Sequence, residues 1–193
     1  MIMKAGIDEV GRGCIAGPVV AACVWIDEER LLDLAVTDSK KISVLKREKL
    51  SQIICQRAYS WGIGVATVTE VDRINILQAT WEAMRRARAN CWFKPEEVWI
   101  DGRDNPFQDI KAHTVIGGDA KIPSISAASI VAKVYRDSLM QVYDRQYPGY
   151  GFINHKGYGT KAHMQDITNH GVCPIHRKSF APVRDIIERE TVQ

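Results

Sequence analysis

The sequence has no apolar run that approaches the roughly 18 residues needed to cross a membrane. Nor does it open with a signal peptide, because Asp8 and Glu9 interrupt the first apolar segment. Its five cysteines are odd in number, widely spaced and free of any CxxC pair, a pattern that favours reduced thiols. Internal repeats and low-complexity tracts are absent as well. We therefore expect a cytoplasmic protein that makes no contact with a membrane.

The sequence also lacks a strong charge of one sign. Its formal net charge is +3 at pH 7 and its isoelectric point is about 8.6, which is compatible with a polyanionic ligand if the basic residues cluster. Hydrophobic residues make up 46% and charged residues 25% of the chain, as in ordinary globular proteins. At 193 residues the chain fits one domain. We expect a core over residues 1–147 and a helical portion over residues 148–193.

Alternating apolar and polar stretches predict the secondary structure. The first strand is expected to begin at 4–7. Gly62 and Gly64 lie in a later expected strand, where their lack of a side chain permits another part of the chain to pack closely across it. We expect five strands, near 4–7, 19–26, 61–68, 98–100 and 111–116. We expect five longer helices, near 44–59, 76–89, 124–147, 161–170 and 181–190. Thr69 and Glu70 are expected to cap an additional short helix. Ser43 and Thr160 are the predicted N-caps of two of these helices. The order of elements predicts an α/β fold with a mixed sheet flanked by helices.

Two adjacent carboxylates, Asp8 and Glu9, stand where the first strand runs out and are followed by Gly11-Arg12-Gly13. In a regular strand neighbouring side chains point to opposite faces, so we expect the glycines to re-aim the chain and bring both acids to one site. Paired carboxylates repel each other unless a cation neutralises them. Hard divalent ions such as Mg²⁺ and Mn²⁺ prefer oxygen ligands of this kind. The pair therefore predicts a metal site.

Two further strands end in an acid beside a glycine, at Asp101 and at Asp119. A lone strand-end Asp is more often a turn former or a helix cap. Open α/β sheets, however, bind their ligands at strand ends, and four acids there would need divalent cations among them. Two ions roughly 3.5–4 Å apart are a common device for in-line displacement at phosphorus. The pattern favours phosphoryl-transfer chemistry.

Basic and aromatic residues suggest how a nucleic-acid strand would be held. Arg12 can present a guanidinium to a phosphate, and Lys40 and Lys41 are candidate phosphate contacts, although all three also suit a solvated surface. The segment 155–161, which contains Lys156 and Tyr158, mixes basic groups with glycines and a ring that can stack on a sugar or base. Other aromatic residues are expected to pack in the interior: Tyr143, Tyr147, Tyr150 and all five tryptophans, Trp25, Trp61, Trp81, Trp92 and Trp99.

Taken together, these motifs resemble bacterial ribonuclease HII, in order and over nearly the whole chain from residue 6 to residue 183. The resemblance is carried by IDEVGRG (7–13), TDSKK (37–41), IDGR (100–103), GGDAKIPSISAASIVAKVYRD (117–137), HKGYGTKAH (155–163) and HRKSFAPV (176–183). It implies a ribonuclease H-like fold with a helical C-terminal extension. It also implies an endoribonuclease that cleaves the RNA strand of RNA–DNA hybrids and acts at ribonucleotides embedded in duplex DNA.

The resemblance also implies roles for individual residues. The family's four metal-binding acids fall on Asp8, Glu9, Asp101 and Asp119, and a further nearby acid falls on Asp137. Asp137 also stands four residues after Lys133, which suits an ordinary helical ion pair. The family's substrate-binding loop falls on Gly11, Arg12 and Gly13, and its ribose-sensing tyrosine falls on Tyr158. With Mg²⁺ or Mn²⁺ bound, an activated water would attack the phosphorus 5′ to the ribonucleotide and leave a 3′-hydroxyl and a 5′-phosphate.

Other interpretations stay open on the sequence alone. A zinc site would draw on His155, His163, His170, Cys173 and His176, although their spacing matches no regular zinc finger. Loop histidines beside a nucleic-acid groove are the simpler interpretation. A non-catalytic hybrid-binding module has no use for carboxylates facing phosphates, and an integrase or Holliday-junction resolvase would not share the DEVGRG and SAASIVAK blocks. We expect a monomer, and we find no QxxLxxFF-like segment for docking on a sliding clamp.

Overall fold

The computed structural model of the protein describes residues 3–34, 36 and 43–191. Five strands form one mixed sheet in the order β3-β2-β1-β4-β5. β1 pairs antiparallel with β2, which pairs antiparallel with β3, whereas β1 pairs parallel with β4 and β4 parallel with β5. The strands are β1 (Met3–Val10), β2 (Val19–Asp27), β3 (Ser60–Ala66), β4 (Glu97–Asp101) and β5 (Lys111–Val115). This confirms the predicted mixed sheet.

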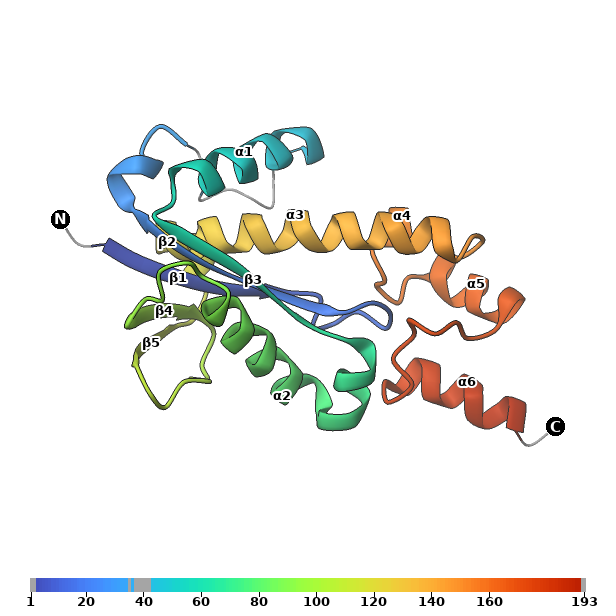
Figure 1. Ribbon diagram of the computed structural model, residues 1–193. Coiled ribbons are helices and arrows are strands. Elements are labelled where there is room, and N and C mark those ends of the chain that lie inside the picture. The colour runs from blue at the N-terminus through green and yellow to red at the C-terminus, as the bar shows by residue number, and fades with distance from the viewer. Residues whose placement is uncertain (1–2, 35, 37–42, 192–193) are drawn as a thin grey trace.

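Helices cover both faces of the sheet (Figure 1). Apolar side chains of the strands therefore alternate between two cores. One face packs against α2 (Val68–Ala89). The other packs against α1 (Val44–Arg57) and the long α3 (Pro123–Gln146), with the short η1 (Glu28–Leu31) at its side. Along β2, Val19 and Ala21 lie in the first core and Val20 and Ala22 in the second. That alternation is the period of two that a strand imposes.

Close approach of helices to the sheet depends on glycines. A Cβ at Gly64 would lie 1.9 Å from the carbonyl oxygen of Ala83, and one at Gly62 would lie 2.3 Å from that of Ala87. Both partners belong to α2, so the predicted close packing across β3 is confirmed. On the opposite face a Cβ at Gly6 would lie 2.1 Å from the backbone of Ser124. The start of α3 therefore lies directly on β1.

The chain after α3 forms a third core at one end of the molecule (Figure 1). It contains α4 (Phe152–His155), α5 (Lys161–His170) and α6 (Ala181–Thr191). Ile15 and Ala16, from the segment between β1 and β2, share this core with Met140 of α3. The helical C-terminal portion is therefore packed against the segment that follows the first strand. Within the described residues, no helix is long and apolar enough to span a membrane.

Several boundaries differ from those expected. Thr67, rather than Thr69, caps α2, and its side chain and that of Glu70 form a reciprocal capping box. The two helices expected on either side of residue 75 form one element that is kinked at Asn75, whose φ is 66°. Ser43 and Thr160 cap α1 and α5 as predicted.

The prediction that all five tryptophans are core residues was wrong. Trp92 is 88% exposed and Trp61 is 38% exposed. Trp92 lies beyond the end of α2, just after its C-cap Asn90. By contrast Tyr150 is buried, and Tyr143 and Tyr147 pack on the third core as expected.

Candidate functional site

The four predicted acids line a single pocket of about 470 Å³ at the end of the sheet. Backbone and side chains from β1, the loop after it, α1, β4, α3 and the segment that contains Tyr158 surround it. The lining residues are Asp8, Glu9, Val10, Gly11, Arg12, Gly13, Arg47, Asp101, Asp119, Ser129, Ile130, Lys133 and Tyr158. The sequence prediction that three separate strand ends meet is therefore confirmed in position.

Strand register brings the acids of β1 and β4 together. Ile7 is paired with Ile100 in the parallel ladder, and the pairing between these strands ends there. Asp8 and Asp101, one residue further along, therefore lie side by side at the edge where the two strands part. Glu9 still belongs to β1, which runs to Val10, so the glycines do not re-aim the pair as we had expected. Asp8 and Glu9 both reach the pocket because the pocket opens where the pairing of β1 with β4 ends.

Asp119 arrives from the other side, just after β5. It lies in the short helix η3 (Gly118–Ala120), which follows Gly117 in a left-handed conformation with φ 64°. The amide of Gly118 donates a hydrogen bond of 2.6 Å to Oδ1 of Asp101. This contact joins the ends of β4 and β5 and holds the Asp101 carboxylate at the rim of the pocket.

Burial and mutual repulsion disfavour the charged forms of Asp8 and Glu9 at this site. Asp8 is only 5% exposed, and burial, followed by the charge of Glu9, raises the pKa of the Asp8 carboxyl well above its ordinary value. Hydrogen bonding from Ser129 opposes that rise. Burial also raises the pKa of Glu9, while Arg12 opposes the rise. Such clustered negative charge is stabilised by added positive charge.

Protein groups occupy several of these carboxylate oxygens. The amide of Glu9 donates to Oδ1 of Asp8 at 2.7 Å, and Nη1 of Arg12 lies 3.4 Å from Oε1 of Glu9. In the described part of the chain, no three His, Cys, Asp or Glu side chains are placed so that they could hold one metal ion together. The four acids share a pocket without converging on a single point. As oxygen donors they suit a hard divalent ion in kind, and their buried charge is the type that such an ion offsets.

The loop after β1 carries the predicted substrate-binding residues. Gly11 is buried and has a φ of 96°, in the region that favours glycine. Arg12 and Gly13 are exposed beside the acids, and all three residues line the pocket. A guanidinium and a turn of backbone amides therefore lie next to the carboxylates, where a phosphate would meet both.

The segment after α4 brings Tyr158 to the same pocket, with 45% of the residue exposed. Its ring is therefore accessible to a ligand. Lys156 is not among the lining residues; its φ is 52°, and its carbonyl oxygen accepts a hydrogen bond of 2.8 Å from Nη1 of Arg136. Lys40 and Lys41, the other two predicted contacts, lie outside the described residues.

Asp137 makes the helical ion pair that its spacing predicts. Its Oδ1 lies 2.8 Å from Nζ of Lys133, one turn earlier in α3. Lys133 lines the pocket, whereas Asp137 is not among its lining residues. Asp137 therefore contacts a residue that lines the pocket without lining it itself.

Three polar lining residues were missed from the sequence: Arg47, Ser129 and Lys133. Ser129 and Lys133 are four residues apart in α3 and therefore lie on one face of that helix. The hydroxyl of Ser129 lowers the pKa of the Asp8 carboxyl. That spacing was the available signal, but the small residues around Ser129 suggested only helix packing.

Of the residues considered as zinc ligands, Cys173 belongs to the third core and His170 is exposed. The rings of His155, His163 and His176 pack against Phe152 of that core. His155 and His163 are stacked with ring centroids 4.1 Å apart, and Nε2 of His163 lies 3.0 Å from Nε2 of His176. The remaining ring nitrogens of these three residues also have hydrogen-bond partners in the protein. Their nitrogens are therefore used in holding the fold together.

Solved structures establish the class of protein. Ribonuclease H2 from Pyrococcus horikoshii OT3 superposes with a TM-score of 0.84 at 28% identity and covers 100% of both chains. The Bst-RNase HIII structure in complex with Mn²⁺ gives a TM-score of 0.68 at 18% identity, over 100% of this chain and 71% of that one, and supports the fold alone. The fold is therefore ribonuclease H-like.

Sequence comparison identifies the family. The model of the family described as Ribonuclease HII matches residues 5–183. Ribonuclease HII of Dechloromonas aromatica is 52% identical over 181 residues, which cover 94% of this chain and 92% of that protein. Ribonuclease HII 1 of Methylibium petroleiphilum is 46% identical over 187 residues, covering 97% and 94%. The chain belongs to the ribonuclease HII family and is a metal-dependent ribonuclease H enzyme; membership implies activity on RNA–DNA hybrids.

Proposed function

We propose that this enzyme nicks duplex DNA on the 5′ side of an embedded ribonucleotide, as well as cleaving the RNA strand of hybrids, and leaves a 3′-hydroxyl and a 5′-phosphate. The observation that carries the proposal is the meeting of Asp8, Glu9, Asp101 and Asp119 in one pocket with the 11–13 loop and Tyr158. Carboxylates on one side and phosphate- and ribose-binding groups on the other are what hydrolysis at a specific phosphodiester requires.

The four acids are the proposed ligands of Mg²⁺ or Mn²⁺. A bound divalent ion supplies Lewis acidity, which activates water and offsets the charge that develops on the phosphate. Glu9 would have to leave Arg12, 3.4 Å away, in order to serve as a ligand. Arg12 would then be released to pair with the phosphate that enters. Because both events separate Glu9 from Arg12, we expect metal binding to strengthen substrate binding and substrate binding to strengthen metal binding.

Recognition of the ribonucleotide is assigned to the other side of the pocket. The amides and side chain of the 11–13 loop would hold the backbone phosphate, and Tyr158 would contact the ribose, whose 2′-hydroxyl distinguishes RNA from DNA. Lys156, Lys40 and Lys41 are proposed to add sequence-independent phosphate contacts. Asp137 has a supporting role, because it orients Lys133 at the pocket.

We also propose that the enzyme acts as a monomer, as a single catalytic domain in the cytoplasm, without recruitment by a C-terminal clamp-binding segment. A solved relative from Archaeoglobus fulgidus, 27% identical with a TM-score of 0.77 over 93% of this chain and 96% of that one, is a PCNA:RNase HII complex. Size-exclusion chromatography with and without a bacterial sliding clamp tests two of these statements, the monomeric state and the lack of clamp recruitment. A complex that elutes with the clamp would contradict the second.

Two matched duplexes test the function, one all-DNA and one with a single ribonucleotide, each incubated with Mg²⁺ or Mn²⁺ and then with EDTA. We expect metal-dependent nicking on the 5′ side of the ribonucleotide and no cleavage of the all-DNA duplex. Cleavage of both duplexes would keep the metal site but remove the ribose readout. If only a long RNA–DNA hybrid is cut, the embedded-ribonucleotide activity is wrong.

A further inference from the structure

Two arginines are completely buried behind the pocket. Arg136 of α3 and Arg177, which precedes α6, are each 0% exposed. Within the described residues, neither guanidinium has a carboxylate at ion-pair distance. A buried charge is expensive unless it is well hydrogen-bonded, and burial, reinforced by repulsion from Arg136, lowers the pKa of Arg177 to about 10. The fold retains two costly positive charges, so their contacts require an explanation.

Arg177 donates only to backbone carbonyls of the loop that follows β1. Its Nη2 lies 2.7 Å from the oxygen of Gly11 and its Nη1 lies 2.9 Å from that of Arg12. Nε and Nη2 both reach the oxygen of Gly17, at 3.0 and 2.8 Å. All three donor nitrogens of the guanidinium are thus used on a segment 160 to 166 residues away in the sequence.

Arg136 joins that loop to a second one. Its Nε and Nη2 donate to the oxygens of Pro18 and Ala16 at 3.0 and 3.1 Å, and its Nη1 donates to that of Lys156 at 2.8 Å. The guanidinium also explains the glycine at position 11, because a Cβ on Gly11 would lie 2.2 Å from Nε of Arg136.

The second loop carries Tyr158, so the two recognition elements are joined. The amides of Ile15 and Ala16 both donate to the oxygen of Gly157, at 2.9 and 3.2 Å. A Cβ on Gly157 would lie 2.4 Å from the oxygen of Ala16. The phosphate-binding loop and the segment with Tyr158 therefore form one assembly, and the two arginines lie at its back.

Peptide geometry gives this arrangement a consequence for ligand binding. In a trans peptide the C=O and the following N–H point in opposite directions. Because the oxygens of Gly11 and Arg12 face Arg177, the amides of Arg12 and Gly13 point away from it. In the described structure neither of these two amides donates a hydrogen bond to the protein. They are left for an anion, and two positive charges behind them favour one.

We propose that Arg136 and Arg177 are positioning residues for substrate: they hold the 11–13 loop and Tyr158 in one fixed arrangement and turn the loop amides toward the phosphate beside the ribonucleotide. Neither arginine touches the substrate. The inference rests on the proposed function and adds to it the residues on which the geometry of recognition depends.

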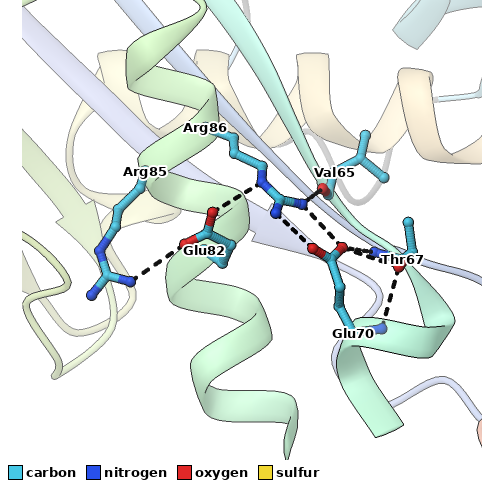
Figure 2. Close-up of polar contacts among 6 residues, drawn as sticks. All are labelled: Val65, Thr67, Glu70, Glu82, Arg85 and Arg86. Atoms are coloured by element: carbon cyan, nitrogen blue, oxygen red, sulfur yellow. Dashed lines mark hydrogen bonds and ion pairs between the residues drawn. The ribbon is translucent and has the colours of Figure 1, made fainter. Parts of the chain in front are cut away.

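The test compares Arg177→Lys and Arg136→Lys with Arg86→Lys. A lysine keeps the charge but cannot reproduce the fork of a guanidinium. Arg86 is the control: it also donates to a backbone carbonyl, that of Val65 at 2.7 Å, and it lies on α2 beside Glu70 (Figure 2). It is not among the residues that line the pocket. Each protein is assayed on the duplex with one ribonucleotide, well below its own melting temperature.

For Arg177→Lys we expect KM to rise about ten-fold or more, since small misplacements of binding groups cost at least that much, with a smaller change in kcat. Because the 11–13 loop also carries Arg12, a displaced loop should lower the slope of log affinity against log salt by about one cationic phosphate contact, roughly 0.9. Arg86→Lys should change neither quantity. A general loss of stability would not alter the salt slope of the folded protein.

The outcomes separate the inference from the function on which it rests. Wild-type protein that fails to nick the duplex contradicts the proposed function. Active wild type together with a folded Arg177→Lys whose KM and salt slope are unchanged overturns the positioning role. If Arg177→Lys does not fold, Arg136→Lys decides by the same two measurements, because it holds the same loop through Ala16 and Pro18.

Discussion

His163 and His176 share a hydrogen bond of 3.0 Å between their Nε2 atoms in the core formed by the C-terminal helices. The amide of Cys173 donates to Nδ1 of His176 at 2.9 Å, so that nitrogen accepts and Nε2 of His176 carries the proton. Nδ1 of His163 then donates to the carbonyl oxygen of Tyr158 at 2.9 Å. The chain of bonds is complete only when both rings are neutral.

Acid should therefore destabilise the protein through this pair. Burial lowers the pKa of both His163 and His176 to about 4; His155 adds repulsion to each, and Asp166 opposes the shift at His163. Above pH 6.5 both rings are neutral in the folded protein and in the unfolded chain. Below it the unfolded chain takes up protons that the folded protein refuses until about pH 4, so stability falls across that window. We expect a loss of roughly 3 kcal/mol in the free energy of unfolding between pH 7 and 5.

Urea unfolding at a series of pH values measures this loss, and NMR titration of the ring protons assigns it. The variant His163→Gln should show a weaker pH dependence. A matched control is His113→Gln, because His113 lies on β5, stacked on Trp99 and away from this core. Rings of His163 and His176 that titrate near pH 6.5 in the folded protein would contradict the prediction.

A second prediction concerns the packing of α2 on the sheet. In Gly64→Ala the new methyl group would meet the backbone oxygen of Ala83 at 1.9 Å, and a backbone atom cannot rotate away. The helix would have to move, which we expect to cost about 3 kcal/mol of stability. Gly13→Ala is the control for stability, since nothing lies within 4 Å of a Cβ there. Equal melting temperatures for the two variants would refute the packing argument.

The sequence allowed the sheet and its acids to be predicted for a simple reason. Apolar runs stop at Asp8 and at Asp101, and Asp119 follows a third expected strand and two glycines. The structure places all three acids at one pocket. Local signals also sufficed for the caps at Ser43 and Thr160. Such features depend on residues close in the chain, where spacing and residue type carry the information.

Features set by distant parts of the chain were not predictable. Trp92 has the same side chain as a core residue, but its position beyond α2 leaves it 88% exposed. Arg136 and Arg177 were the reverse case, since arginine is ordinarily exposed and their carbonyl partners lie 20 to 166 residues away. Only the folded chain reveals that both are buried.

A third prediction concerns the capping box of α2. Glu70 accepts from the amide of Thr67 at 2.8 Å and from Nη2 of Arg86 at 2.6 Å (Figure 2). Hydrogen bonding from Arg86 is the largest cause that lowers the pKa of Glu70, to about 2. The contribution of the ionised Glu70 to stability is present at pH values above the ordinary pKa of 4.5 and is lost as the pH falls toward 2.

Glu70→Gln should cost about 1 kcal/mol at pH 7, because the amide keeps part of the cap but loses the ion pair. Calorimetry at pH 7 and pH 3 measures the difference, which should shrink at the lower pH. Cleavage kinetics at pH 7 should not change, since Glu70 is not among the residues that line the pocket. A variant as stable as wild type at pH 7 would argue against the ion pair.

The last prediction separates activity from stability at Asp8. This carboxyl is 5% exposed, stands beside Glu9 and Asp101, and is destabilised by burial and by both charges. In Asp8→Asn the side chain keeps its size and can still accept from the Glu9 amide, but the repulsion is gone. We expect turnover to be abolished, whereas the melting temperature in EDTA should equal or exceed that of wild type. The reason is that the charge proposed to bind the divalent ion is buried and is repelled by two neighbouring carboxylates. Thermal unfolding in EDTA and in Mg²⁺ tests both parts: wild type should gain stability from the ion and Asp8→Asn should gain less. A fully active Asp8→Asn would refute the assignment of Asp8 as a metal ligand, and an inactive variant that unfolds far below wild type in EDTA would make its inactivity a matter of folding.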